Sequence, residues 1–118
     1  MMRLRIEEKR LDVEGRTYVL RCNMAVLDAL EATYGDFQAV MALPIREGMA
    51  AILAAMLNDC AEDRGWDPDW TARKVKKIFP YATLLDLDII GMLTRAVTPA
   101  NADAEPETKT EPGDDAGN

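Results

Sequence analysis

Residues 15–36, GRTYVLRCNMAVLDALEATYGD, contain in order the signals for a strand, a helix start, a helix and a helix end. Residues 17–22 are rich in β-branched and aromatic side chains, which is typical of a strand. Asn23 can accept a hydrogen bond from a backbone N–H and so begin a helix, and Gly35 can end it. A strand that leads directly into a capped helix is therefore expected here.

A second strand is expected before this one, because apolar and charged residues alternate over residues 3–7 and again over residues 11–13. Glu14 and Gly15 separate the two strands, and Gly15 adopts positive φ at little cost, so the pair can fold as an antiparallel hairpin. A lone hairpin is only marginally stable in water. Its apolar face must therefore pack on helices, and that face comprises Leu11, Val13, Tyr18 and Leu20.

Helical periodicity continues after residue 35. Asp36 can cap a short helix that ends near Leu43, because the residue before Pro44 is pushed out of the helical region. A long helix over residues 45–64 follows, ended by Gly65. Its apolar residues recur at intervals of three and four and form one stripe: Met49, Ile52, Leu53, Met56, Leu57 and Cys60.

Two further helices are expected. The first begins at Asp67-Pro68-Asp69 and continues to about Phe79, with Trp70, Val75, Ile78 and Phe79 as buried candidates. The second runs from about Ala82 to Val97 and is ended by Pro99. Its apolar face consists of Leu85, Ile89, Met92, Leu93 and Ala96.

These elements predict an α+β fold that is mostly α, with an N-terminal β-hairpin followed by four or five short packed helices. Residues 1–97 form the compact domain. Residues 98–118 lack every large apolar side chain and are expected to be a disordered acidic C-terminal tail. Residues 1–97 carry 13 basic and 15 acidic side chains, whereas the tail carries Lys109 and six acidic residues, so most of the net charge of −7 lies in the tail.

Composition argues against several classes of function. A nearly neutral domain provides no field that concentrates nucleic acid. The longest apolar stretch, residues 49–57, is too short to cross a bilayer, so no membrane association is expected. The two cysteines, Cys22 and Cys60, are expected to be free thiols in a reducing cytoplasm.

The residue types also argue against catalysis. The chain has no histidine, which removes the commonest general base and the commonest metal ligand. Asp63, Asp67 and Asp69 are spaced faintly like a calcium loop, but Gly65, Pro68 and Lys74 occupy positions where that loop needs other residues. The glycines are isolated, so no phosphate-binding loop is present. We expect no enzyme activity, no catalytic residues, no metal and no cofactor.

One basic cluster remains, formed by Arg73, Lys74, Lys76 and Lys77 near Trp70. Three interpretations fit it: a solvated helix face, a patch for an acidic protein partner, or a recognition helix for duplex DNA. The seven methionines also suit a surface that adapts to more than one partner, although core packing explains each of them singly.

The strand at residues 15–21, the helix at 27–35 and the following segment 37–41 resemble tail assembly chaperones of long-tailed bacteriophages and related prophages. The later helix over residues 52–62, the Trp-Asp-Pro-Asp-Trp break and the helix-turn-helix ending extend the resemblance over about residues 11–97. The resemblance implies a non-enzymatic protein of the host bacterial cytoplasm that binds the tape-measure protein and helps to recruit the tail-tube protein. It also implies that a frameshifted longer form can exist. A homo-oligomer is compatible with this role.

The resemblance does not specify a binding surface, so the pattern of residues supplies the hypothesis. A helix stripe longer than a small core requires can lend its edge to a partner helix. We therefore expect partner contacts at Met49, Ile52, Met56 and Trp70, with Arg73, Lys74 and Lys77 as a polar rim. The alternatives are a small helical DNA-associated regulator and a structural virion component or interaction module.

Overall fold

The structure is a computed structural model that describes residues 6–99. Within these residues, an antiparallel hairpin of β1 (Glu8–Val13) and β2 (Arg16–Arg21) precedes six helices. The helices are α1 (Met24–Tyr34), α2 (Phe37–Met41), α3 (Ile45–Arg64), α4 (Ala72–Ile78), α5 (Tyr81–Leu87) and α6 (Ile89–Val97). The α+β, mostly α fold expected from the sequence is confirmed. The expectations for Leu4 and for the acidic residues after position 99 lie outside the described residues.

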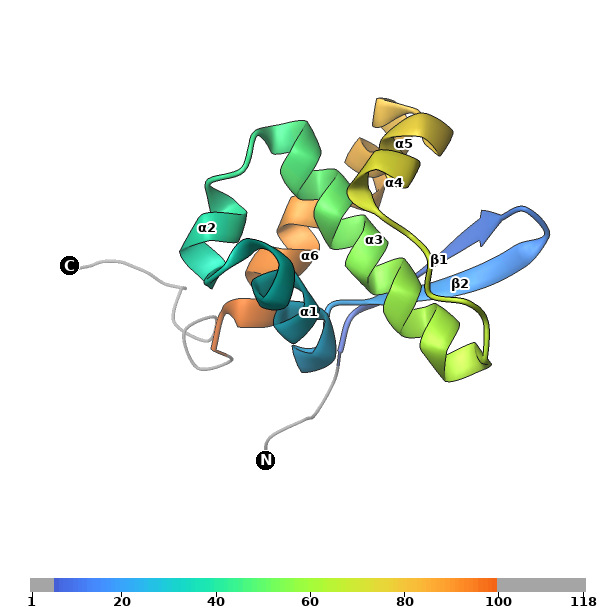
Figure 1. The fold of residues 1–118 in the computed structure, drawn as a ribbon, viewed down its shortest axis with the longest axis horizontal. Helices are drawn as coiled ribbons and strands as arrows, with labels where there is room; N and C mark the ends of the chain where they lie inside the picture. The colour runs from blue at the N-terminus through green and yellow to red at the C-terminus, as the bar shows by residue number, and fades with distance from the viewer. Residues whose placement is uncertain (1–5, 100–118) are drawn as a thin grey trace, which may run out of the picture.

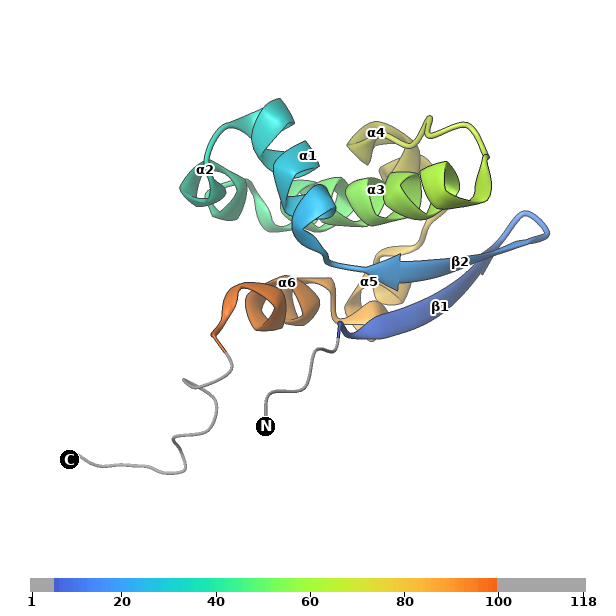
Figure 2. The same cartoon turned by 90° about the horizontal axis from the view of Figure 1, so that it is seen from below.

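The elements form two layers, and α3 is the central helix of one of them (Figures 1 and 2). The helices α1, α2, α3 and α4 make one layer, and the hairpin with α5 and α6 makes the other. The central helix α3 packs against β2, α1, α4, α5 and α6, so its middle turns are buried on almost every side. The least exposed large side chains are Leu20, Val26, Ile52, Leu53, Met56, Leu57, Val75, Ile89 and Leu93.

The hairpin closes through the expected two-residue turn. Val13 pairs with Arg16, and both turn residues have positive φ, 52° for Glu14 and 81° for Gly15. Positive φ at both central residues is the requirement of a type I′ turn, whose twist matches that of the strands. Val13, Tyr18 and Leu20 are buried as predicted and Leu11 is half-buried. Strand β1 begins only at Glu8, and Ile6 before it is exposed.

The helix caps predicted from the sequence are also present. The Asn23 side chain accepts a hydrogen bond from the Val26 N–H at 2.9 Å, and the Asp36 carboxylate accepts one from the Ala39 N–H at 2.9 Å. Gly65 ends α3 in the left-handed conformation with φ 76°. These caps act within a few residues, which is why sequence alone locates them.

The start of the fourth helix was predicted too early. Helix α4 begins at Ala72, where the Thr71 hydroxyl accepts a hydrogen bond from the Lys74 N–H, and residues 67–70 are not helical. The Asn58 side chain explains the difference, because its amide donates to the Trp70 carbonyl and accepts from the Trp70 N–H, both at 2.9 Å. These bonds hold Trp70 against α3 in an extended segment. Ile78, predicted to be buried, is exposed.

The fifth predicted helix is divided into α5 and α6. Asp88 adopts the left-handed conformation with φ 57° and ψ 50°, which interrupts the helix between Leu87 and Ile89. The interruption turns the two helices relative to one another, so that Leu84 and Ile89 both reach the core. Leu85 and Ala96, expected on the buried face, are exposed instead.

Candidate partner-binding surface

The apolar residues expected to contact a partner lie in the interior. Met49, Ile52, Met56 and Trp70 are each at most 5% exposed. The sequence reveals one stripe on α3, but several elements pack around that helix and leave no edge of the stripe at the surface. Met49, Ile52 and Met56 are therefore core residues and not the exposed stripe edge that the sequence suggested, whereas Trp70, although only 5% exposed, lines a surface groove described below.

The basic residues expected at the rim, unlike the four apolar residues, lie at or near the surface. Arg73 and Lys77 are exposed, and within residues 6–99 neither forms an ion pair. Lys74 is partly buried, with its Nζ 3.3 Å from the Asp69 carboxylate and 4.4 Å from the centre of the Trp70 ring. The neighbouring Lys76 forms an ion pair with Glu47 of α3. We call Arg73, Lys76 and Lys77 the basic ridge of α4.

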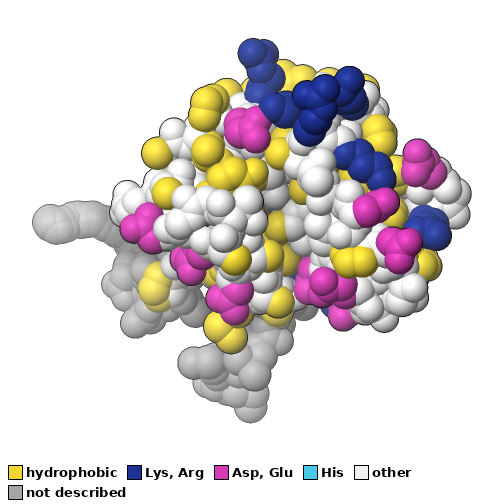
Figure 3. Space-filling model, viewed as in Figure 1, with side chains coloured by type: hydrophobic (Ala, Val, Ile, Leu, Met, Phe, Trp, Pro, Cys, Tyr) yellow, Lys and Arg dark blue, Asp and Glu magenta, His cyan; other side chains and the backbone are white. Residues whose placement is uncertain are grey.

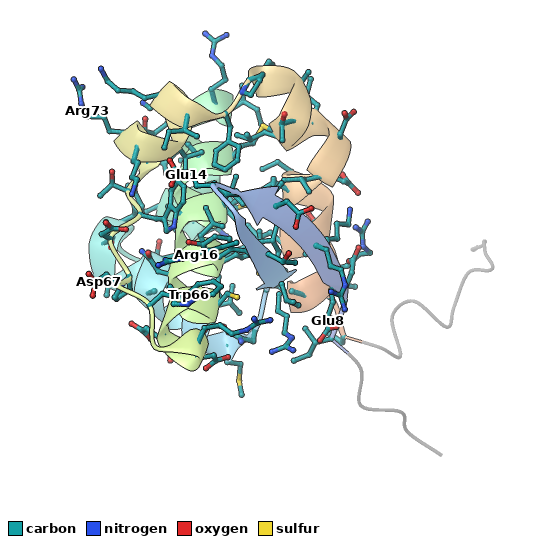
Figure 4. The ribbon with its side chains drawn as sticks, turned by 90° about the vertical axis from the view of Figure 1, so that its right-hand side faces the viewer. Glu8, Glu14, Arg16, Trp66, Asp67 and Arg73 are labelled. Carbon is teal, nitrogen blue, oxygen red and sulfur yellow. The ribbon has the colours of Figure 1, made fainter. Side chains whose placement is uncertain are left out.

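The space-filling view shows where this charge lies. Lys and Arg side chains gather along the upper border of the face in Figure 3, over the region where α4 and α5 lie in Figure 1. Arg73 points outward from the molecule in Figure 4. The described part of the chain thus has a locally basic surface although residues 1–97 are close to neutral as a whole.

A groove of about 200 Å³ runs over α3 between α1 and the beginning of α4. Alanines of α3 line it, namely Ala51, Ala54 and Ala55, together with Asn58 of the same helix. Its sides combine small residues with larger ones: Ala29, Thr33, Thr71 and Ala72 with Leu30, Tyr34 and Trp70. Methyl groups fill too little space to close the gap between the two flanking helices. The groove is therefore open at the surface and largely apolar at its base.

The two walls run in the same direction. Near the start of α1, Asn23 donates a hydrogen bond to Asp59, close to the end of α3. The start of α4 is tied to Asn58, and further along α4 Lys76 reaches Glu47 in the first turn of α3. Both α1 and α4 are consequently antiparallel to α3. A helix placed in the groove parallel to α3 would lie antiparallel to both walls.

The α4 wall is anchored by an aromatic cluster. The Trp70 indole N–H donates to the Tyr18 hydroxyl at 3.4 Å, and the Trp70 and Phe79 ring centres are 5.8 Å apart. Tyr18 also packs edge-on against Trp66 at 5.1 Å between ring centres. Because these contacts join the hairpin to the segment before α4, they hold the groove wall in place.

A second, more polar cavity of about 340 Å³ lies between the hairpin tip and the α3–α4 connection. Its charged lining consists of three acidic residues and two basic ones, namely Glu14, Asp67 and Asp69 with Arg16 and Lys74. Figure 4 shows Glu14 and Arg16 on the same side of the molecule as Trp66 and Asp67, and the Arg16 guanidinium lies 4.6 Å from the Trp66 ring centre. Among residues 6–99 no group of three potential ligands is placed to hold a metal ion.

Both cysteines are buried and free. Burial raises the pKa of the Cys22 thiol to about 11, so the nucleophilic thiolate is scarce at neutral pH. The Cys60 sulfur accepts a hydrogen bond from the Val19 N–H at 3.4 Å, which joins α3 to the outer edge of β2. The two thiols therefore serve as core residues.

The sequence predicts no membrane-spanning segment, and the described helices bear on this expectation. None of those within residues 6–99 combines the length and the apolar composition that a bilayer crossing requires.

Comparisons with models of protein families, with curated proteins and with solved structures find no match to this chain. The sequence analysis did not predict the alanine groove. The sequence nevertheless contains a pattern that could have indicated it, because Ala51, Ala54 and Ala55 occupy positions i, i+3 and i+4 of one helix. Small residues with this spacing allow another helix to approach closely.

Proposed function

We propose that this chain is a tail assembly chaperone that binds the tape-measure protein of a long-tailed phage or prophage in the host bacterial cytoplasm. In this role it keeps the client soluble and helps to recruit tail-tube subunits. The observation that supports the proposal best is the alanine-floored groove between α1 and α4. The sequence resemblance supplies the identity of the client, and the groove supplies a way to bind it.

The groove suits a helical client for a steric reason. Amphipathic helices dock by laying an apolar face into a groove, with anchors at intervals of three and four residues. Ala51, Ala54 and Ala55 leave room for larger anchors of the client, such as leucine side chains. A long helical protein with exposed apolar stripes aggregates unless these stripes are covered, and a series of such grooves would cover them.

The charges around the groove favour a client with acidic residues along one flank. The basic ridge lies on α4, the helix whose first residue Ala72 lines the groove, and its Arg73 is exposed without an ion pair within residues 6–99. Complementary charges speed association and fix orientation more than they add affinity. Binding is therefore expected to weaken moderately, and not to disappear, when salt is raised.

The residue types favour binding over chemistry. The chain has no histidine, and the Cys22 thiol, with its pKa raised to about 11, is held in the protonated form at neutral pH. We propose a role without covalent catalysis, in which the chaperone leaves the assembly once the tail is complete.

The proposal is tested by co-expression with the tape-measure protein that, on this proposal, is encoded beside this chain. Ala55→Phe places a ring in the groove and should reduce the soluble fraction of the client severalfold, since the half-buried Ala55 can change without altering the core. Ala96→Phe makes the same change on the exposed surface of α6 and is the matched control. Circular dichroism verifies that both variants remain folded.

Two results would count against the proposal. One is an equal yield of soluble client with Ala55→Phe, Ala96→Phe and the unmodified chain. The other is stable retention of the chain in purified phage particles, detected by mass spectrometry, because a structural component remains in the particle and a chaperone leaves.

A further inference from the structure

Three large apolar side chains stay exposed where α4 leads into α5. Ile78 and Tyr81 are each 40% exposed and Leu85 is 54% exposed. None of them lines the alanine groove. We call these three residues, with Arg46 and Lys77, the α4–α5 corner.

The backbone explains why this corner is apolar. Pro80 ends the α4 segment and begins α5, so Ile78 and Tyr81 are only three residues apart across a sharp change of direction. Tyr81 and Leu85 are four residues apart on α5 and therefore share one face of it. The break at Asp88 buries Leu84 and leaves Leu85 outside, which completes the exposed surface.

The charges beside this surface are positive. The Arg46 guanidinium lies 5.8 Å from the centre of the Tyr81 ring, and Lys77 is exposed at the end of α4. Within residues 6–99 neither forms an ion pair, and the nearby Glu47 is already paired with Lys76. Asp86 follows Leu85 and therefore projects about 100° around α5 from it.

We propose that the α4–α5 corner docks a second polypeptide segment, in which an apolar anchor is flanked by Asp or Glu residues. The anchor covers Tyr81 and Leu85, and the carboxylates of the segment meet Arg46 and Lys77. Charge complementarity selects this occupant. A second copy of the chain would place the same unpaired cations against each other, and like charges at an interface are unfavourable.

This surface is separate from the groove. The groove wall uses Ala72 at the start of α4, whereas the corner begins at Lys77, five residues or roughly 7.5 Å further along the helix axis. Arg73 and Lys76 of the basic ridge lie between the two in sequence, and Lys77 belongs to both the ridge and the corner. Both surfaces can therefore be occupied at once, which would let the domain hold two different polypeptides together.

A displayed library of random peptides tests the inference. The library is selected against the Ala55→Phe variant, whose groove is filled, and one enriched peptide is synthesised and measured by fluorescence anisotropy with the unmodified chain. We expect enriched peptides to contain an aliphatic or aromatic residue flanked by Asp or Glu. Leu85→Ser and Arg46→Glu should each weaken the peptide about fivefold or more.

A matched control separates local from general charge effects. Arg10→Glu changes the net charge as Arg46→Glu does, but at an exposed residue on β1, and should leave the peptide affinity unchanged. All variants are compared after circular dichroism confirms that they are folded. Because the peptides are selected against the variant with a filled groove, this experiment tests the corner independently of the groove. The inference about the corner can therefore be wrong while the proposed function is right, and the proposed function can be wrong while the corner binds peptides.

Several outcomes would overturn the inference. Enriched peptides without acidic residues, or affinities unchanged by Leu85→Ser and Arg46→Glu, would show that the corner does not select this partner. Sedimentation with phosphatidylserine–phosphatidylcholine vesicles that is lost in Leu85→Ser, with no peptide enriched, would identify a lipid surface instead. A dimer in analytical ultracentrifugation that dissociates in Leu85→Ser would identify a second copy.

Discussion

Replacing Asn58 by alanine should destabilise the domain by about 2 kcal/mol. The Asn58 amide makes two hydrogen bonds of 2.9 Å to the main chain of Trp70, a residue that is only 5% exposed. Each bond contributes about 1 kcal/mol, and stranding the Trp70 N–H and C=O adds about another 1 kcal/mol. The better helix propensity of alanine offsets roughly 0.6 kcal/mol of this loss.

Urea denaturation followed by tryptophan fluorescence measures the change. Thermal unfolding should show a midpoint lower by roughly 10 °C, because about 1 kcal/mol shifts Tm by about 4–8 °C in a domain of this size. Glu62→Ala, an exposed substitution on the same helix, is the control and should stay within about 0.5 kcal/mol of the unmodified chain.

The same substitution links stability to the groove. Asn58 and Trp70 both line it, so releasing Trp70 from α3 should loosen the α4 wall and weaken binding of the helical client that we propose for the groove. A loss of less than about 0.5 kcal/mol in Asn58→Ala would show that these bonds do not hold the segment before α4. The explanation given for the late start of α4 would then be wrong.

Three further predictions concern the hairpin and the titrating groups. Glu14→Asn should raise the free energy of unfolding by a few tenths of a kcal/mol in urea titrations, because Glu14 has φ 52° and asparagine tolerates this conformation better; a lower value would argue against a type I′ turn. Burial raises the pKa of Cys22 from 9.0 to about 11, so between these pH values the folded state retains a proton that the unfolded state loses. The free energy of unfolding should therefore fall between about pH 9 and 11. It should fall less in Cys22→Ala, which lacks the thiol. The Arg95 guanidinium lowers the pKa of Glu7, so the ionised carboxylate stabilises the folded state above the ordinary pKa of 4.5, and this stability is lost as the pH falls through the lower pKa of the folded state. Glu7→Gln should therefore reduce the loss of unfolding free energy at acidic pH. An unchanged loss in this variant would show that the contact with Arg95 does not stabilise the fold.

The sequence predicts the elements whose signals are local. Asn23 and Asp36 cap helices through main-chain N–H groups three residues away, and Gly65 ends α3 where expected. The bounds of α1 and α3 follow from these caps together with the apolar periodicity. The exposure of Arg73 and Lys77 is predicted for a similar reason, since long charged side chains seldom leave water without a partner.

The candidate site was less predictable because it depends on which surfaces the helices leave uncovered. Periodicity identifies the apolar stripe of α3 but not the number of elements that pack around it. Met49, Ile52 and Met56 therefore belong to the core, whereas the alanines beside them form the floor of a groove. The contrast between the buried Leu84 and the exposed Leu85 likewise depends on the left-handed Asp88.

The hairpin turn, the helix caps and the mostly helical fold are thus determined by sequence alone, because the interactions that specify them span only a few residues. The late start of α4, the break at Asp88, the alanine groove and the basic α4–α5 corner were decided only by tertiary structure. Each of these depends on the packing of separate elements, as when Asn58 bonds Trp70 or Glu7 pairs with Arg95 across most of the described chain. Contacts between residues so far apart in the sequence produce no periodic pattern from which they could be predicted.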